Sequence, residues 1–251
     1  MIELQTRRRP SAIYVVTYFI LWIVLFEFVL PVNNVLPKPS IVIQSFGALW
    51  DEYHLAVNYL NTTASVYLSI LFAYLLLHFL SHFFDNRKSV VSDFIHSLNW
   101  FSKFLPGILI GFLLIYWFHD SLYIEFVFAL LTSFFSFVIF FQKRRAHLCH
   151  EYVDAARSLG ISEISIRRKV IWKSLQPEIF NHIFVLHLYI WSLVIAFEFI
   201  YGKFGIGNIF RLALQYRDLS AMFSAFLIVG ITIFAGRGVI IFLKKKFAFW
   251  E

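Results

Sequence analysis

Long apolar stretches, separated by short polar segments, dominate this sequence of 251 residues. Hydrophobic side chains make up 60% of the chain and aromatic ones 20%, and the mean hydropathy is +0.73, whereas a soluble domain is about 45–50% apolar. A helix needs about 20 apolar residues to cross the hydrocarbon core of a bilayer. The sequence therefore predicts an all-α polytopic membrane protein with a transmembrane domain over residues 13–243. The six predicted spans are about 13–30, 62–84, 100–118, 122–141, 179–201 and 219–243.

The distribution of basic residues predicts the orientation of these spans, because lysine and arginine are enriched in cytoplasmic loops. With both termini inside, 18 of the 22 basic residues fall inside and four fall outside. We therefore expect a cytoplasmic N-terminus over 1–12, a cytoplasmic loop over 142–178 and a cytoplasmic C-terminus over 244–251. The net charge of +7 is thus a topology signal and does not indicate binding of nucleic acid. The four outer basic residues are Lys38, Lys203, Arg211 and Arg217.

The first apolar run could be a signal peptide, because Arg7-Arg8-Arg9 precedes it. However, no cleavage site of small residues follows it, so we interpret it as a retained first span. Pro37 and Pro39 then stiffen the chain, and Ser40 is a plausible N-cap for an amphipathic helix at the membrane interface. One face of that helix would carry Ile43, Phe46, Trp50 and Tyr53.

The longest polar interruption covers residues 151–177. Its first part repeats apolar residues at helical spacing and ends at Gly160, and glycine is favoured just beyond a helix C-terminus. Ser162 is then a plausible N-cap for a second helix over 163–175, and Pro177 ends the pattern. The sequence thus predicts two short helices joined by a bend, with a small apolar stripe suited to a groove on a soluble partner. The stripe consists of Val153, Ala156 and Leu159.

This stretch resembles the EAA loop of the membrane subunits of binding-protein-dependent ABC importers. The family pattern is Glu-Ala-Ala, three residues, glycine, nine residues and an aliphatic residue, which Asp154-Ala155-Ala156, Gly160 and Val170 match in order. Asp154 keeps the charge of the family's glutamate, whereas Trp172 and Lys173 replace a leucine and a proline. The resemblance implies that the loop contacts a separate ATPase. The residues implied in this coupling are Asp154, Ala155, Ala156, Leu159, Gly160, Val170 and Pro177.

The resemblance covers roughly residues 35–250. The Leu-Pro-x-Pro segment at 36–39 and the element Gly205-Ile206-Gly207 are similar to those of the sulfonate/nitrate/taurine branch of these importer permeases. Glu198 lies near the outer end of its predicted span, as do Glu27 and Glu125. We expect Glu198, with Gly205 and Gly207, to act at an outer gate or in docking of a binding protein.

The resemblance implies the permease fold of a type I ABC importer in the bacterial inner membrane. In that family two permease copies, here expected to form a homodimer, enclose the pathway for a small solute, such as nitrate or an organosulfonate. ATPase subunits bind ATP and Mg²⁺ on the cytoplasmic side, and an extracytoplasmic solute-binding protein delivers the solute. The chain would contact membrane lipid, bind no cofactor, metal or nucleic acid, and not be an enzyme. Consistently, the sequence contains no phosphate-binding loop of the type Gly-x-x-x-x-Gly-Lys-Ser/Thr.

Two other functions stay open. His78 and His82 lie four residues apart and would share one helical face, which a membrane-embedded metal enzyme could use, although interfacial histidines are the simpler interpretation. The second alternative is a membrane anchor that binds an ATPase without transporting a solute.

Overall fold

The computed structural model describes residues 12–30, 36–81, 97, 107–119, 121, 123–147, 150–248 and 250. Every element in this part of the chain is a helix and none is a strand, so the predicted all-α class is confirmed. The elements are α1 (Ala12–Ile23), the π-helix η1 (Val24–Val29), α2 (Pro39–Asp51), α3 (Leu55–Leu80), α5 (Gly107–Trp117), α6 (Ile124–Ala146), α7 (His150–Ser158), α8 (Glu163–Ser165), the π-helix η3 (Ile166–Ile171), α9 (Trp172–Tyr201), α10 (Ile206–Tyr216) and α11 (Leu219–Phe247).

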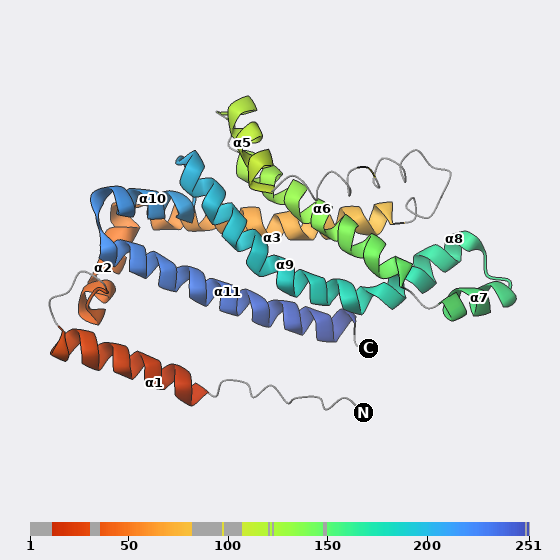
Figure 1. Cartoon of the computed structure of the whole chain (residues 1–251), viewed down its shortest axis with the longest axis horizontal. Helices are drawn as coiled ribbons and strands as arrows, with labels where there is room; N and C mark the ends of the chain where they lie inside the picture. Colours follow the sequence, from red (N-terminus) through yellow and green to blue (C-terminus); the bar gives the residue numbers. More distant parts are fainter. Residues whose placement is uncertain are drawn as a thin grey trace.

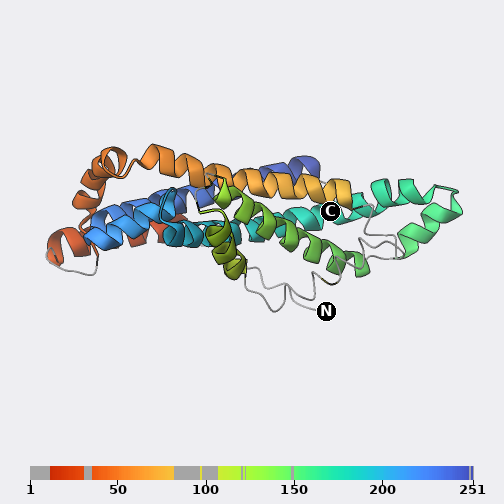
Figure 2. The same cartoon turned by 90° about the horizontal axis from the view of Figure 1, so that it is seen from above.

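Four long helices, α3, α6, α9 and α11, run along an elongated bundle (Figure 1). The short helices α2 and α10 lie at one end of the bundle, and α7 and α8 lie at the other (Figures 1 and 2). We call these the α10 end and the hairpin end. The polar segment between α6 and α9 therefore projects from the opposite end to the connection between α9 and α11.

Within the described residues, four helical segments are long and apolar enough to cross a membrane, and two shorter apolar helices accompany them. In chain order these six segments correspond to the six predicted spans, although the first residues of the predicted span 100–118 lie outside the described part. Because the two shorter helices fall below the length of a full crossing, the count of six stays a prediction. The long segments are Leu55–Leu80, Ile124–Ala146, Lys169–Tyr201 and Leu219–Phe247, and the shorter ones are Val16–Val29 and Gly107–Trp117.

Helix α3 begins earlier than the sequence suggested, at Leu55 instead of 62, and the predicted helix 163–175 and predicted span 179–201 form one continuous helical run. Polar residues in the first turn of α3 look like loop residues when burial is unknown. In α3 one of these residues is Asn58, which is buried and hydrogen-bonded to a neighbouring segment. Tertiary contacts therefore extend α3 beyond its apolar run.

The prediction that Pro177 ends a helix is wrong, since α9 continues through it. Proline has no N–H to donate to the carbonyl of the residue four positions earlier, which is Lys173. That carbonyl accepts a hydrogen bond from the indole N–H of Trp250 at 3.1 Å. The C-terminal segment thus supplies the donor that the proline lacks, and the helix is not interrupted.

The predicted amphipathic helix forms as α2, but Ser40 is not its cap. Lys38 is the N-cap and Pro39 is the first helical residue, a position where proline costs no hydrogen bond. The Ser40 hydroxyl and N–H instead donate to the two carboxylate oxygens of Glu27, at 2.9 and 3.3 Å. A carboxylate at this position complements the partial positive charge of the helix N-terminus. On the predicted face Ile43, Phe46 and Trp50 are exposed, whereas Tyr53 is buried.

The main hydrophobic core lies where α3, α6 and α9 meet, and Trp172 closes it at the hairpin end. The Trp172 side chain is only 6% exposed. Its ring contacts those of Tyr74 and His78 in α3 and of Phe141 in α6, with centroids 4.6–6.2 Å apart. One aromatic side chain at the start of α9 therefore joins three of the long helices.

Replacement of Trp172 by alanine should destabilise the bundle by about 3–5 kcal/mol, because it leaves a large cavity in a packed core. Trp50→Ala is the matched control, since that side chain is 61% exposed and an exposed position changes stability by about 0.5 kcal/mol or less. Thermal unfolding of both variants in a mild detergent measures the difference. Equal melting temperatures would contradict the described packing of α9.

Candidate functional site

The segment between α6 and α9 forms a helical hairpin, residues 150–171, with its bend at Gly160. Gly160 has φ of +72°, and its N–H donates to the carbonyl of Arg157 at 2.9 Å. The N–H of Ile161 donates to the carbonyl of Ala156 at 3.1 Å. This pair of bonds is the Schellman motif that commonly ends a helix. Because a Cβ at Gly160 would meet no atom within 4 Å, the backbone conformation, and not space, requires glycine here.

The second arm of the hairpin begins at Ser162, as predicted, since its hydroxyl accepts from the N–H of Ser165. Arg157 connects the two arms. Its guanidinium donates to Glu163 across the bend at 2.7 Å and to Asp154 on its own helix at 3.4 Å. The hydrogen bond and the charge of Glu163 raise the pKa of Arg157 above its ordinary value. These exposed ion pairs orient the two arms but contribute little to stability.

The predicted apolar stripe divides between two environments. Ala156 is buried, and Val153 is half-buried against the main core. Leu159, by contrast, is 79% exposed, and Ile161 is 40% exposed. The hairpin therefore holds two apolar side chains, Leu159 and Ile161, at an exposed tip on either side of Gly160.

The other residues of the predicted coupling set lie at different depths. Asp154 and Ala155 are exposed on α7, whereas Val170 is half-buried in η3 and Pro177 is buried in α9. At the base of the hairpin, Arg144 of α6 forms a 2.9 Å salt bridge with Glu178 of α9. The structure thus brings the set onto one continuous segment that leads from the tip into the bundle.

At the α10 end, the carboxylate of Glu198 is fully buried and occupies the N-terminus of α10. It accepts a hydrogen bond from the N–H of Gly207 at 2.8 Å and one from the hydroxyl of Thr62 at 2.7 Å. The same hydroxyl accepts from the N–H of Ile206 at 2.8 Å. A helix N-terminus leaves such N–H groups without partners inside the helix, and here α3 and α9 supply them.

The two glycines predicted with Glu198 allow this close approach. A Cβ at Gly205 would overlap the Glu198 carboxyl group, and a Cβ at Gly207 would overlap the carbonyl of Ile195. The N–H of Gly205 donates to the side chain of Asn58 at 2.8 Å. The structure therefore brings Glu198, Gly205 and Gly207 together as a folded joint, while a role in gating or docking stays a prediction.

Sequence reasoning missed the partners that α3 supplies to this joint. Asn58 lies before the predicted span 62–84 and Thr62 is its first residue, so neither stands out as a polar group within the hydrocarbon. A third residue of α3, Asn61, donates to the buried carboxylate of Glu125 in α6. Nearby, the hydroxyl of Tyr53 donates to Asp218 at 3.2 Å. Burial and the Asp218 carboxylate raise the pKa of Tyr53 to about 12, so it stays a neutral donor at physiological pH.

A second polar group inside the bundle was also missed. His187 of α9 is fully buried, and its Nε2 lies 3.1 Å from the indole N–H of Trp191 and 3.1 Å from the hydroxyl of Tyr67. The indole can only donate, so Nε2 accepts and Nδ1 carries the proton of the neutral ring. Within the described residues Nδ1 has no hydrogen-bond partner. The pairing of Tyr67 with His187 across two helices is not visible in sequence spacing.

The structure adds little to the alternative of a metal enzyme. His78 packs against Trp172 at 4.6 Å between ring centroids, and His82 lies outside the described residues. Among the residues that the structure describes, no three histidine, cysteine, aspartate or glutamate side chains come together as a metal site would need.

A bundle of apolar helices long enough to cross a membrane, with a helical hairpin projecting from one end, is the architecture of a polytopic membrane protein. The profile of the family described as the binding-protein-dependent transport system inner membrane component matches residues 78–248. Since this match covers more than half of the chain, the protein belongs to that family, the inner-membrane permeases of binding-protein-dependent ABC transporters. Members are normally not catalytic themselves, and the family implies an ATPase and a binding protein as partners. A search of curated proteins gave no match.

Substitutions of Glu198 should separate the contribution of its hydrogen bonds to stability from the contribution of its charge. Glu198→Leu leaves the N–H of Gly207 without its acceptor, a loss of about 1–3 kcal/mol for a buried group, whereas the hydroxyl of Thr62 can still donate to the carbonyl of Asn58. Glu198→Gln keeps one acceptor oxygen and should therefore retain most of the stability. Gly207→Ala should lower the folded yield severely, whereas Gly230→Ala, where a Cβ meets nothing within 4 Å, should not. Size-exclusion profiles and melting temperatures in detergent measure the folding and stability of all four variants. A tolerated Gly207→Ala would contradict the close approach of α10 to α9.

Proposed function

We propose that this chain is the permease subunit of an ABC importer and that the helical hairpin couples it to a separate ATPase. The observation that carries the proposal is the exposed apolar tip, Leu159 and Ile161, held outside the bundle by the bend at Gly160. A largely exposed leucine at the end of a projecting hairpin suits insertion into a groove on a soluble partner. The family match supports such a partner.

The hairpin also has the mechanical connection that coupling needs. From Glu163 onward, α8, η3 and α9 follow one another without a non-helical residue as far as Tyr201. Movement of the tip would therefore be transmitted into a helix that runs the length of the bundle. In the proposed cycle, ATP and Mg²⁺ bound by the ATPase bring two hairpins together, the bundles rock open toward the outside, and hydrolysis resets them. The coupling free energy passes through this contact in both directions.

For the orientation, we propose six spans with both termini and the hairpin on the cytoplasmic side of the bacterial inner membrane. The excess of basic residues near the hairpin end supports it, including Arg144, Arg157 and the three lysines Lys244–Lys246. The α10 end would then face the extracytoplasmic binding protein. Glu198, Gly205 and Gly207 would hold the surface on which that protein docks.

We further propose that two copies of this chain enclose the pathway and that the solute is a small anion, such as nitrate or an organosulfonate. The support is the resemblance of the Leu-Pro-x-Pro segment and the Gly-Ile-Gly element to the sulfonate/nitrate/taurine branch. Uptake into vesicles that contain the chain, its ATPase and its binding protein separates a permease from an anchor that binds an ATPase without transport.

Gly160→Val should strongly reduce co-purification of the ATPase with the tagged chain. A β-branched residue at φ of +72° is strained by about 1–3 kcal/mol, which favours a different bend and displaces the tip. Gly238→Val is the matched control, because that glycine also has open surroundings but lies within α11. Leu159→Asp should give the same loss without strain, since Leu159 is exposed.

Both Gly160→Val and Leu159→Asp should retain the melting temperature of the wild type to within a few degrees, because neither position contributes to the core. If Gly160→Val and Leu159→Asp recover as much ATPase as the wild type and Gly238→Val do, the hairpin is not the coupling contact.

A further inference from the structure

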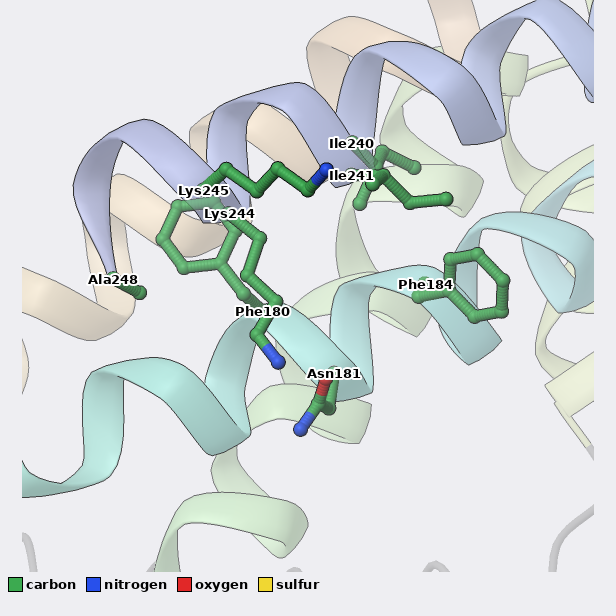
Figure 3. A pocket seen from close by; sticks show the side chains of 8 residues that line it. All are labelled: Phe180, Asn181, Phe184, Ile240, Ile241, Lys244, Lys245 and Ala248. Carbon is green, nitrogen blue, oxygen red and sulfur yellow. The ribbon is translucent and has the colours of Figure 1, made fainter. Parts of the chain in front are cut away.

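A pocket of about 530 Å³ lies between α9 and α11 toward the hairpin end of the bundle (Figure 3). Phe180 and Phe184 of α9 and Ile240 and Ile241 of α11 give it apolar walls. Ala248, just beyond α11, is also part of the lining. The remaining lining residues are polar or basic: Asn181, Lys244 and Lys245.

The charge at this pocket has one sign. Lys244 and Lys245 line it, and in Figure 3 the side chain of Lys244 points from α11 toward Asn181 of α9. A third cation, Arg237, lies two turns earlier on α11 with its guanidinium 4.3 Å from the ring centroid of Phe184. None of the eight lining residues is acidic. The pocket therefore combines apolar walls with basic side chains in its lining.

We infer that this pocket binds the headgroup and upper acyl chain of an anionic phospholipid. Basic pockets between transmembrane helices near the membrane surface suit lipid phosphate groups, and long basic side chains at span ends extend to the headgroup region. Phe184, Ile240 and Ile241 would contact the acyl chain, while Lys244 and Lys245 would contact the phosphate. The inference depends on α9 and α11 lying in a membrane, and not on the proposed contact with an ATPase.

Two other occupants fit the pocket less well. A second copy of the chain would have to bring acidic groups to these lysines, but the chain has net charge +7, with 22 basic residues against 15 acidic ones. Free phosphate would satisfy the lysines but leave the apolar walls without a partner. An amphipathic lipid satisfies both parts of the lining.

The test is native mass spectrometry of the full chain, purified in neutral detergent and titrated with phosphatidylglycerol or phosphatidylcholine. We expect the wild type to retain phosphatidylglycerol in preference to phosphatidylcholine. Lys245→Gln should lower retention of phosphatidylglycerol about fivefold, the typical effect of one basic residue at an anionic membrane surface. The double change Lys244→Gln and Lys245→Gln should remove the preference.

Lys246→Gln is the matched control, because it removes the same charge from a residue that does not line the pocket and lies over the ring of Phe247. Equal retention of the two lipids by the wild type would overturn the inference. So would an equal loss with Lys246→Gln and Lys245→Gln, which would indicate a diffuse charge effect. Displacement of the lipid by an equal concentration of inorganic phosphate would show a site for a free anion instead. Because no ATPase is present, failure of the proposed coupling would leave these results unchanged.

Discussion

In hydrocarbon, every backbone N–H and C=O must find its partner within the protein, and the structure depends on how this chain meets that constraint where its helices bend or end. At the α10 end, Glu198, Thr62 and Asn58 accept from the three consecutive N–H groups of residues 205–207. At the hairpin end, Trp250 donates to the carbonyl that Pro177 leaves without a helical donor. These side chains hold the joints at the two ends of α9, so the long helix between them is fixed to both ends of the bundle.

This arrangement explains how a chain without the phosphate-binding loop Gly-x-x-x-x-Gly-Lys-Ser/Thr could serve an ATP-driven transporter. The hairpin is bound to the bundle at its base, through Trp172 and the pair Arg144–Glu178, and is free of core contacts at its tip, Leu159. A base that is part of the core transmits displacement, because packed interiors are stiff. An exposed tip can be bound by a partner without unfolding anything.

The sequence predicted much of the fold because the dominant signals are local. Apolar runs predicted the long helices, and Gly160 and Ser162 predicted the hairpin bend, since glycine beyond a helix and serine before one act through their own backbone neighbours. The errors came from long-range contacts. Pro177 would end an isolated helix but is accommodated by Trp250, 73 positions later in the sequence. Ser40 looked like a cap but pairs with Glu27, and the roles of Asn58 and Thr62 exist only once α3 lies against α10.

If the tip of the hairpin is the contact with an ATPase, it must lie within cross-linking distance of that ATPase. Cys149 is the single cysteine of the chain, so a Cys149→Ser background allows one new cysteine at a time, at Leu159 on the tip or at Tyr216 at the opposite end, both well exposed. The measurement is thiol cross-linking to the ATPase in membranes, with and without ATP. We predict a cross-link from position 159 whose yield changes with ATP and none from position 216. A cross-link from position 216 and none from position 159 would show that the hairpin tip is not the contact with the ATPase.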